Sequence, residues 1–121
     1  MEKLDDYGEK LMDIDRRVFD RIGDEMKVEF SAFKFDKSEN PVDNLDEVPI
    51  QGKVKFFRPK GSWSDMRYDS QVMDSPTWLD ICVVANDMIR LSGDYHHIFL
   101  EAVDVVCEEN GVKVAKFSMG S

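Results

Sequence analysis

The residues whose types could support chemistry lie in one stretch, Asp94-Tyr95-His96-His97-Ile98-Phe99-Leu100-Glu101, which holds both histidines of the chain. If this stretch is helical, Asp94, His97 and Glu101 share one face, because they are three and four residues apart. Two carboxylates and an imidazole on one face can bind a divalent metal or form an acid-base pair near neutral pH. His96 would point elsewhere and pack against the helix pair.

A solvated polar stripe is the preferred interpretation of the same face. The spacing continues through Asp104 and Glu108, so the polar side chains run along the whole expected helix opposite its apolar side. The repeated Glu-x-x-His pairs of di-metal helical bundles are absent. We therefore predict no catalytic residue, no cofactor-binding residue and no metal ligand.

Other chemical motifs are missing from the sequence. The glycines form neither a GxGxxG nor a GxxxxGK[ST] loop, and no serine lies in a GxSxG motif. Cys82 and Cys107 have no paired ligands with zinc-finger spacing. Both cysteines lie in apolar segments expected to be helical, which predicts buried, reduced thiols rather than a disulfide.

Composition indicates a globular protein. The 121 residues are 42% hydrophobic and 11% aromatic, which suits a single compact α+β domain over residues 1–121. The formal net charge of −9 disfavours binding to nucleic acid. No apolar run is long enough to span a membrane, and the N-terminus lacks the residue order of a secretory signal. The sequence therefore predicts a cytoplasmic protein without nucleic-acid or membrane partners.

The first half of the chain predicts a helix followed by strands. Residues 2–22 carry apolar residues at alternating steps of three and four, which is typical of an amphipathic helix. Alternation predicts one strand over Met26–Phe35 and another over Ile50–Arg58. The polar residues 36–48 between them are expected to form a flexible loop. Residues 62–73 fit either a third strand or an irregular covering segment.

The second half predicts a helical hairpin and a closing strand. Ser75 and Pro76 are suited to start a helix over residues 76–92, and Gly93 is suited to end it at positive φ. Asp94 would cap a second helix over residues 95–109, before a strand that starts at Val112. A strand from His97 to Val106 is the rival interpretation, because that segment is rich in β-branched residues. Its length and the helix punctuation at both ends favour a helix.

The predicted order is therefore α-β-β-(β)-α-α-β. An antiparallel sheet of three to four strands, packed on one face by about three helices, satisfies this order and defines an α+β fold. The pair of helices has the outline of a helix-turn-helix, but residues 95–109 contain no Arg or Lys to contact DNA.

Two functions follow from these expectations. The first is a small non-enzymatic protein that acts through protein–protein interaction and self-associates as a homodimer. Its basis is a surplus of large apolar side chains, namely Phe33, Phe35, Phe57, Trp63 and Met66. The alternative is a ligand- or metal-binding domain or an enzyme with a pocket between the sheet and helix 76–92. The expected rim of that pocket comprises Asp80, Asp87, His96, His97 and Glu101.

Overall fold

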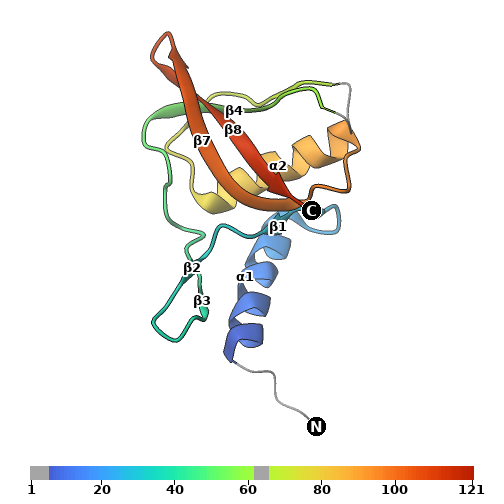
Figure 1. Cartoon of the computed structure of the whole chain (residues 1–121), viewed down its shortest axis with the longest axis vertical. Coiled ribbons are helices and arrows are strands. Elements are labelled where there is room, and N and C mark those ends of the chain that lie inside the picture. Colours follow the sequence, from blue (N-terminus) through green and yellow to red (C-terminus); the bar gives the residue numbers. More distant parts are fainter. Residues whose placement is uncertain (1–5, 62–65) are drawn as a thin grey trace.

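A computed structural model describes residues 6–61 and 66–121 of the chain, with the α+β arrangement shown in Figure 1. The described residues form two helices, α1 (Asp6–Ile22) and α2 (Trp78–Ser92). The short strands are β1 (Glu29–Phe30), β2 (Lys34–Phe35), β3 (Pro41–Val42), β5 (Tyr68–Asp69) and β6 (Met73–Asp74). The longer strands are β4 (Lys53–Arg58), β7 (Phe99–Glu109) and β8 (Val112–Gly120).

Six of the strands form one mixed sheet. Its order is β1-β7-β8-β4-β5, and β6 also pairs with β4. β7 and β8 form a long antiparallel hairpin, whereas β4 runs parallel to β8 and β1 runs parallel to β7. β2 and β3 make a separate antiparallel pair. The prediction of an antiparallel sheet packed by about three helices is therefore wrong, because the sheet is mixed and the described residues contain two helices.

The predicted helix over residues 95–109 is wrong, and the rival strand interpretation is correct. Asn110 and Gly111 have φ of 51° and 81°, the left-handed values that a two-residue hairpin turn requires at both positions. This turn joins β7 to β8, so Asn-Gly is a hairpin signal here and not a helix stop. The β-branched residues before it pair with β8 across an 11-residue strand.

The predicted helix over residues 76–92 is confirmed, with a different start. Thr77 is the N-cap: its hydroxyl accepts the Asp80 N–H at 3.1 Å, and the Asp80 carboxylate accepts the Thr77 N–H at 3.1 Å. This reciprocal pair satisfies two free donors of the first turn. The hydroxyl of Ser75, the expected cap, instead accepts the Gly52 N–H. Gly93 ends the helix at φ 71°, as predicted.

The other predicted elements are confirmed in part. α1 follows the predicted helix over its described residues, and β4 lies within the second predicted strand. The first predicted strand is reduced to β1 and β2, and residues 36–48 include β3 rather than forming a loop throughout. Residues 66–73 contribute β5 and the start of β6, so part of this segment joins the sheet. Residues 1–5 and 62–65 lie outside the described part.

The core lies between α2, α1 and one face of the sheet. Its fully buried side chains come from both helices and from β1, β4, β7 and β8, and include Ile14, Phe30, Phe56, Ile81, Ile89 and Leu100. Buried Asn86 of α2 fixes the segment before β1, because its carbonyl oxygen accepts the Val28 N–H at 3.0 Å and its amide donates to the Glu25 carbonyl. β1 is thereby held against the beginning of β7.

Candidate functional site

Asp94 is the centre of a buried polar cluster in the turn between α2 and β7. Its carboxylate accepts hydrogen bonds from His97 Nδ1 at 2.9 Å and from the His96 N–H at 3.1 Å. It also pairs with the guanidinium of Arg58 at the end of β4. Asp94 therefore caps no second helix and instead ties the turn to the sheet.

The surroundings of Asp94 favour its ionised form. Burial alone would raise the pKa of this carboxyl, but the His97 and His96 hydrogen bonds, with the positive charge of Arg58, hold the pKa below its usual value. A satisfied, ionised carboxylate with an arginine partner is typical of a structural ion pair. Within residues 6–61 and 66–121, no group of three or more His, Cys, Asp or Glu side chains is arranged to hold a metal.

The structure separates the other residues of the expected site. Glu101 lies on β7 with its carboxylate against Gly120 of β8, so the predicted face of Asp94, His97 and Glu101 does not form. Asp80 belongs to the α2 cap and pairs with Arg21 at 3.0 Å. His96 is exposed rather than packed between helices.

A hollow does lie between α2 and the β5–β6 segment of the sheet, where the alternative function expected a pocket. Its volume is about 430 Å³, and Tyr68, Met73, Val84 and Leu91 are among the residues that line it. Of the expected rim residues, Asp87 alone lines it. The rim residues named from the sequence therefore do not converge on this hollow.

A further candidate binding site is the edge of β7, which has no strand partner over most of its length among the described residues. β1 pairs with Phe99 and Leu100, and the Ser31 N–H donates to the Leu100 carbonyl at 2.9 Å. From Ala102 to Glu109, which we call the β7 edge, no strand in the described part of the chain pairs with this side of β7. Figure 1 shows the hairpin of β7 and β8 extending past α2 toward its turn.

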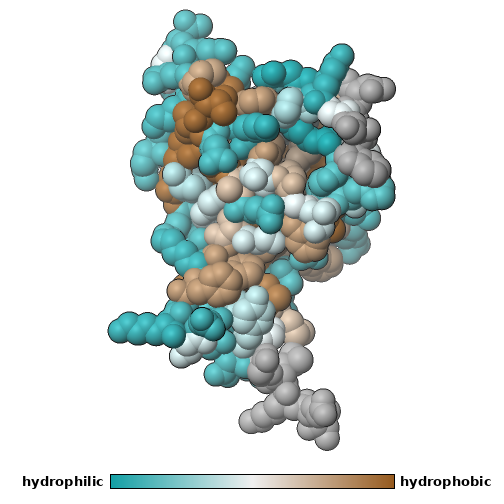
Figure 2. All heavy atoms as spheres, in the orientation of Figure 1, coloured by the Kyte–Doolittle hydropathy of each residue, from teal (hydrophilic) through white to brown (hydrophobic). Residues whose placement is uncertain are grey.

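Exposed apolar side chains lie on this edge. Val105 is 48% exposed and Val106 is 55% exposed, and brown hydrophobic spheres gather on the hairpin near the top of Figure 2. Val105 is opposite Ala115, and Val106 is the extra residue where the register with β8 shifts. Such β-bulges bend and twist a strand locally. The sequence did not indicate this surface, because both valines fall within the helix predicted over residues 95–109.

The two cysteines differ in environment. Cys82 is buried in α2, as predicted, and burial raises the pKa of its thiol to about 12. Cys107 is exposed on β7, so the prediction that it is buried is wrong. Neither cysteine forms a disulfide. Cys107 is therefore a natural probe on the β7 edge.

The apolar residues that motivated an interaction surface are only partly exposed. Phe33 packs on the core, whereas Phe35 is 58% exposed. The ring of Phe35 lies edge-on to the ring of Phe33, with centroids 5.4 Å apart. The ring of Phe57 is covered by the Arg67 guanidinium at 4.6 Å. Met66 is exposed, and Trp63 lies outside the described residues. The described members of this set therefore differ in exposure, with Phe35 and Met66 exposed and Phe33 packed against the core.

Charge distinguishes the β7 edge further. β7 carries four acidic residues and no Lys or Arg: Glu101, Asp104, Glu108 and Glu109. Across the hairpin, Asp104 lies opposite Lys116, and Glu108 lies opposite Lys113. The basic side chains are thus on the β8 side. The β7 edge thus combines backbone groups without a strand partner among the described residues, two exposed valines and three acidic residues, of which Glu109 pairs with Lys55 at 3.8 Å.

No helix in residues 6–61 and 66–121 has the length and apolar character needed to cross a membrane. Comparisons of the chain with protein-family models, with curated proteins and with solved structures found no match.

Proposed function

We propose that this chain is a non-enzymatic binding protein that takes up an extended segment of a partner protein as an added strand on the β7 edge. The observation that carries the proposal is the length of this edge, which runs unpaired from Ala102 to Glu109. An edge strand presents a row of unpaired N–H and C=O groups, which is a template for another strand. Main-chain hydrogen bonds then supply affinity, and alternate side chains supply specificity.

The available space suits one strand. β1 occupies the edge of β7 at Phe99 and Leu100 and then leaves it. The remaining eight residues from Ala102 to Glu109 span about 27 Å at ~3.4 Å per residue. Strands in globular proteins are typically about five to six residues long. A partner segment of that length fits between β1 and the hairpin turn.

The charge of β7 supports a basic partner segment. Opposite charges directly across two strands stabilise their pairing, and like charges destabilise it. Because β7 has acidic residues and no basic ones, the matching segment carries Lys or Arg between small or β-branched residues. Contact with Val105 and Val106 would remove both side chains from water.

A second copy of the chain is a poorer occupant of the same edge. Pairing β7 with another β7 would bring together two strands that each carry four acidic residues. The bulges near Glu101 and Val106 also interrupt the regular ladder that self-pairing needs. The homodimer expected from the sequence is therefore a competing outcome, which self-association measurements can separate from binding of a basic segment.

Cytoplasmic location forms part of the proposal. Both cysteines are free, and Cys107 is exposed. Exposed thiols persist in the reducing cytosol, whereas oxidising compartments favour disulfides.

Titration calorimetry with an eight-residue peptide of alternating Val and Lys tests this function. We expect binding that weakens with added salt, and at least tenfold weaker binding by a peptide with Glu in place of Lys. Asp104→Asn combined with Glu108→Gln should weaken binding severalfold. The matched control, Glu9→Gln with Asp20→Asn, changes two exposed acids of α1 and should leave affinity unchanged. Equal binding of both peptides, or no binding of either, would overturn the proposal.

A further inference from the structure

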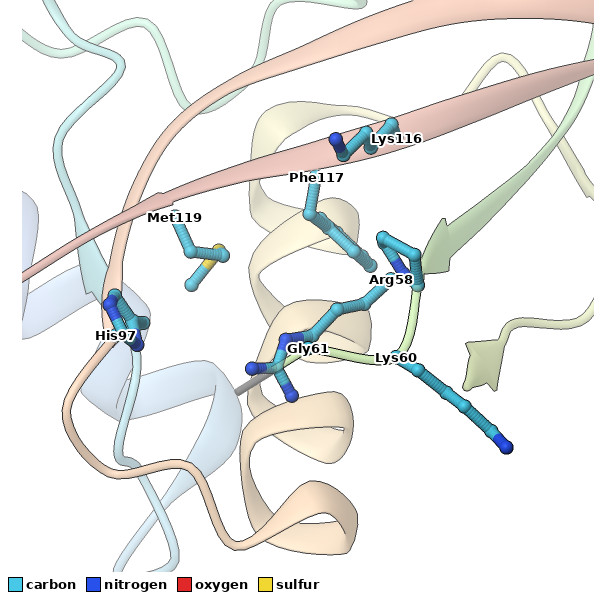
Figure 3. Close-up of a pocket in the computed structure, with 8 residues that line it drawn as sticks. Arg58, Lys60, Gly61, His97, Lys116, Phe117 and Met119 are labelled. Carbon is cyan, nitrogen blue, oxygen red and sulfur yellow. The ribbon is translucent and has the colours of Figure 1, made fainter. Parts of the chain in front are cut away.

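We propose that a second, separate site binds a small organic carboxylate in the pocket beside Arg58 (Figure 3). The pocket has a volume of about 220 Å³ and lies where β4 ends, against the last part of β8. Its lining is Arg58, Pro59, Lys60, Gly61, His97, Lys116, Phe117 and Met119. This place is at the opposite end of β8 from the hairpin turn, so the inference does not depend on strand addition at the β7 edge.

Arg58 supplies the recognition group. Its side chain is 14% exposed, and one terminal nitrogen pairs with Asp94. The other terminal nitrogen, Nη1, is buried and has no hydrogen-bond partner among the described residues. Buried donors in proteins are almost always paired, and a guanidinium offers its N–H groups in a planar fork that matches a carboxylate. Arg58 therefore keeps one donor without a partner among the described residues, which makes it the recognition group we propose for this pocket.

The lining of this pocket holds three basic side chains and no acidic one among the described residues, on a chain of net charge −9. Asp94 balances the charge of Arg58, and Asp104 of β7 lies opposite Lys116, so Lys60 adds the one positive charge of the lining that faces no acidic partner among the described residues. Figure 3 shows the Arg58 side chain reaching across the pocket, whereas the Lys60 side chain extends away from it. Lys60 thus attracts an anion through its field rather than by direct contact.

The apolar side chains in the pocket lining favour an anion with an organic body over an inorganic one. The ring of Phe117 and the side chain of Met119 face the same space as Arg58 in Figure 3. Pro59 adds a further apolar wall. Small-molecule pockets commonly combine such apolar surfaces with a few polar groups that fix orientation. A carboxylate with a short aliphatic body satisfies Arg58 and covers these apolar groups, whereas inorganic phosphate shares only the oxyanion.

Titration of the whole protein with sodium butyrate, butyramide and inorganic phosphate, followed by two-dimensional NMR, tests this site. We expect butyrate to shift the Arg58 Nε–H signal and the amides of Gly61 and Met119, with at least tenfold weaker binding of butyramide and of phosphate. Equal binding of butyramide, equal binding of phosphate, or absence of these shifts with butyrate would each overturn the inference.

Two variants locate the binding group. Arg58→Lys keeps the charge next to Asp94 but loses the planar fork, and we expect at least a tenfold loss of butyrate affinity. Lys60→Gln removes a charge that makes no ion pair among the described residues and should weaken binding two- to threefold. Unchanged affinity in a folded Arg58→Lys protein would contradict the site. If that variant does not fold, the wild-type titration still decides the question.

Discussion

The Ser31 N–H donates to the Leu100 carbonyl at 2.9 Å, and β1 leaves the edge of β7 at this bond. The chain then turns toward β2, so the rest of β7 has a partner on one side only among the described strands. The buried side chain of Asn86 fixes the position of β1 along β7, because this α2 residue accepts the Val28 N–H just before β1 begins. The length of the β7 edge is therefore set by contacts in the core.

Gly93 and Gly61 provide a matched test of the turn after α2. A Cβ added to either glycine would meet no atom of the described residues within 4 Å, but Gly93 alone of the two has a positive φ, of 71°. Gly93→Val should lower the free energy of unfolding by about 1–3 kcal/mol through backbone strain. Gly61→Val should change it by less than about 0.5 kcal/mol. Denaturant melts measure both, and an unchanged Gly93→Val protein would contradict this turn.

Asp94 should stabilise the fold in a pH-dependent way. Asp94→Asn leaves the partly buried Arg58 without its charge partner, and we expect a loss of about 3 kcal/mol at pH 7. Because the pKa of Asp94 is lowered in the folded state, its contribution is present above the unfolded value of 3.8 and disappears as pH falls through the folded pKa. The difference between variant and wild type should shrink below about pH 4.

Chemical denaturation between pH 3 and pH 7 measures this difference. The exposed α2 residue Asp87 provides a control, because Asp87→Asn should remain within about 0.5 kcal/mol of wild type at every pH. A pH-independent loss in Asp94→Asn would show that packing, rather than charge, is responsible.

Asp15 of α1 should have the opposite effect. Its Oδ1 atom is buried with no hydrogen-bond partner among the described residues, and burial raises the pKa of this carboxyl. Ionisation of Asp15 therefore costs stability as pH rises past its unfolded pKa of 3.8. Asp15→Asn should stabilise the protein at pH 7 by about 0.5 kcal/mol, a value kept small because solvent screens a partly exposed group. Its exposed neighbour Asp13, changed to Asn, should show no such gain; destabilisation by Asp15→Asn would refute the assignment.

The cysteines should react unequally with a thiol reagent at pH 8. Cys107 is exposed, whereas Cys82 is buried with a thiol pKa raised to about 12. One thiol should therefore react within minutes in the native protein, and two should react in denaturant. Cys107→Ser should abolish the fast reaction, and Cys82→Ala should leave it unchanged. Two fast thiols in the native protein would contradict the burial of Cys82.

Helical periodicity was sufficient to predict α1 and α2, because each buries a regular stripe of apolar residues such as Ile14 and Val18. β7 was missed for two physical reasons. The bulge at Val106 breaks the alternation of a strand, and Asn110-Gly111 ends helices and forms hairpin turns with equal ease. Giving more weight to the β-branched residues before Asn-Gly would have indicated the hairpin.

The sheet order and the site geometry required long-range information. β4 pairs in parallel with β8, although Val54 and its partner Lys113 are far apart in sequence. The same pairing brings Arg58 close to Asp94. Asp94 and His97 were expected on one face of a helix, with a solvated stripe preferred over a metal or acid-base site, whereas in the structure they pair within the turn after α2. Neither the partner of Arg58 nor the exposed edge follows from local patterns.

Backbone hydrogen exchange of the β7 edge tests the central claim most directly. In the free protein, the outward-facing amides between Ala102 and Glu109 should exchange quickly, whereas β8 amides, which lie between β7 and β4, should be protected. Adding the Val-Lys peptide should slow exchange on β7 at least tenfold and leave β5, at the other edge, unchanged. Peptide binding without new protection on β7 would contradict strand addition at the β7 edge. Protection of these amides in the free protein that increases with protein concentration would instead show that a second copy occupies the edge.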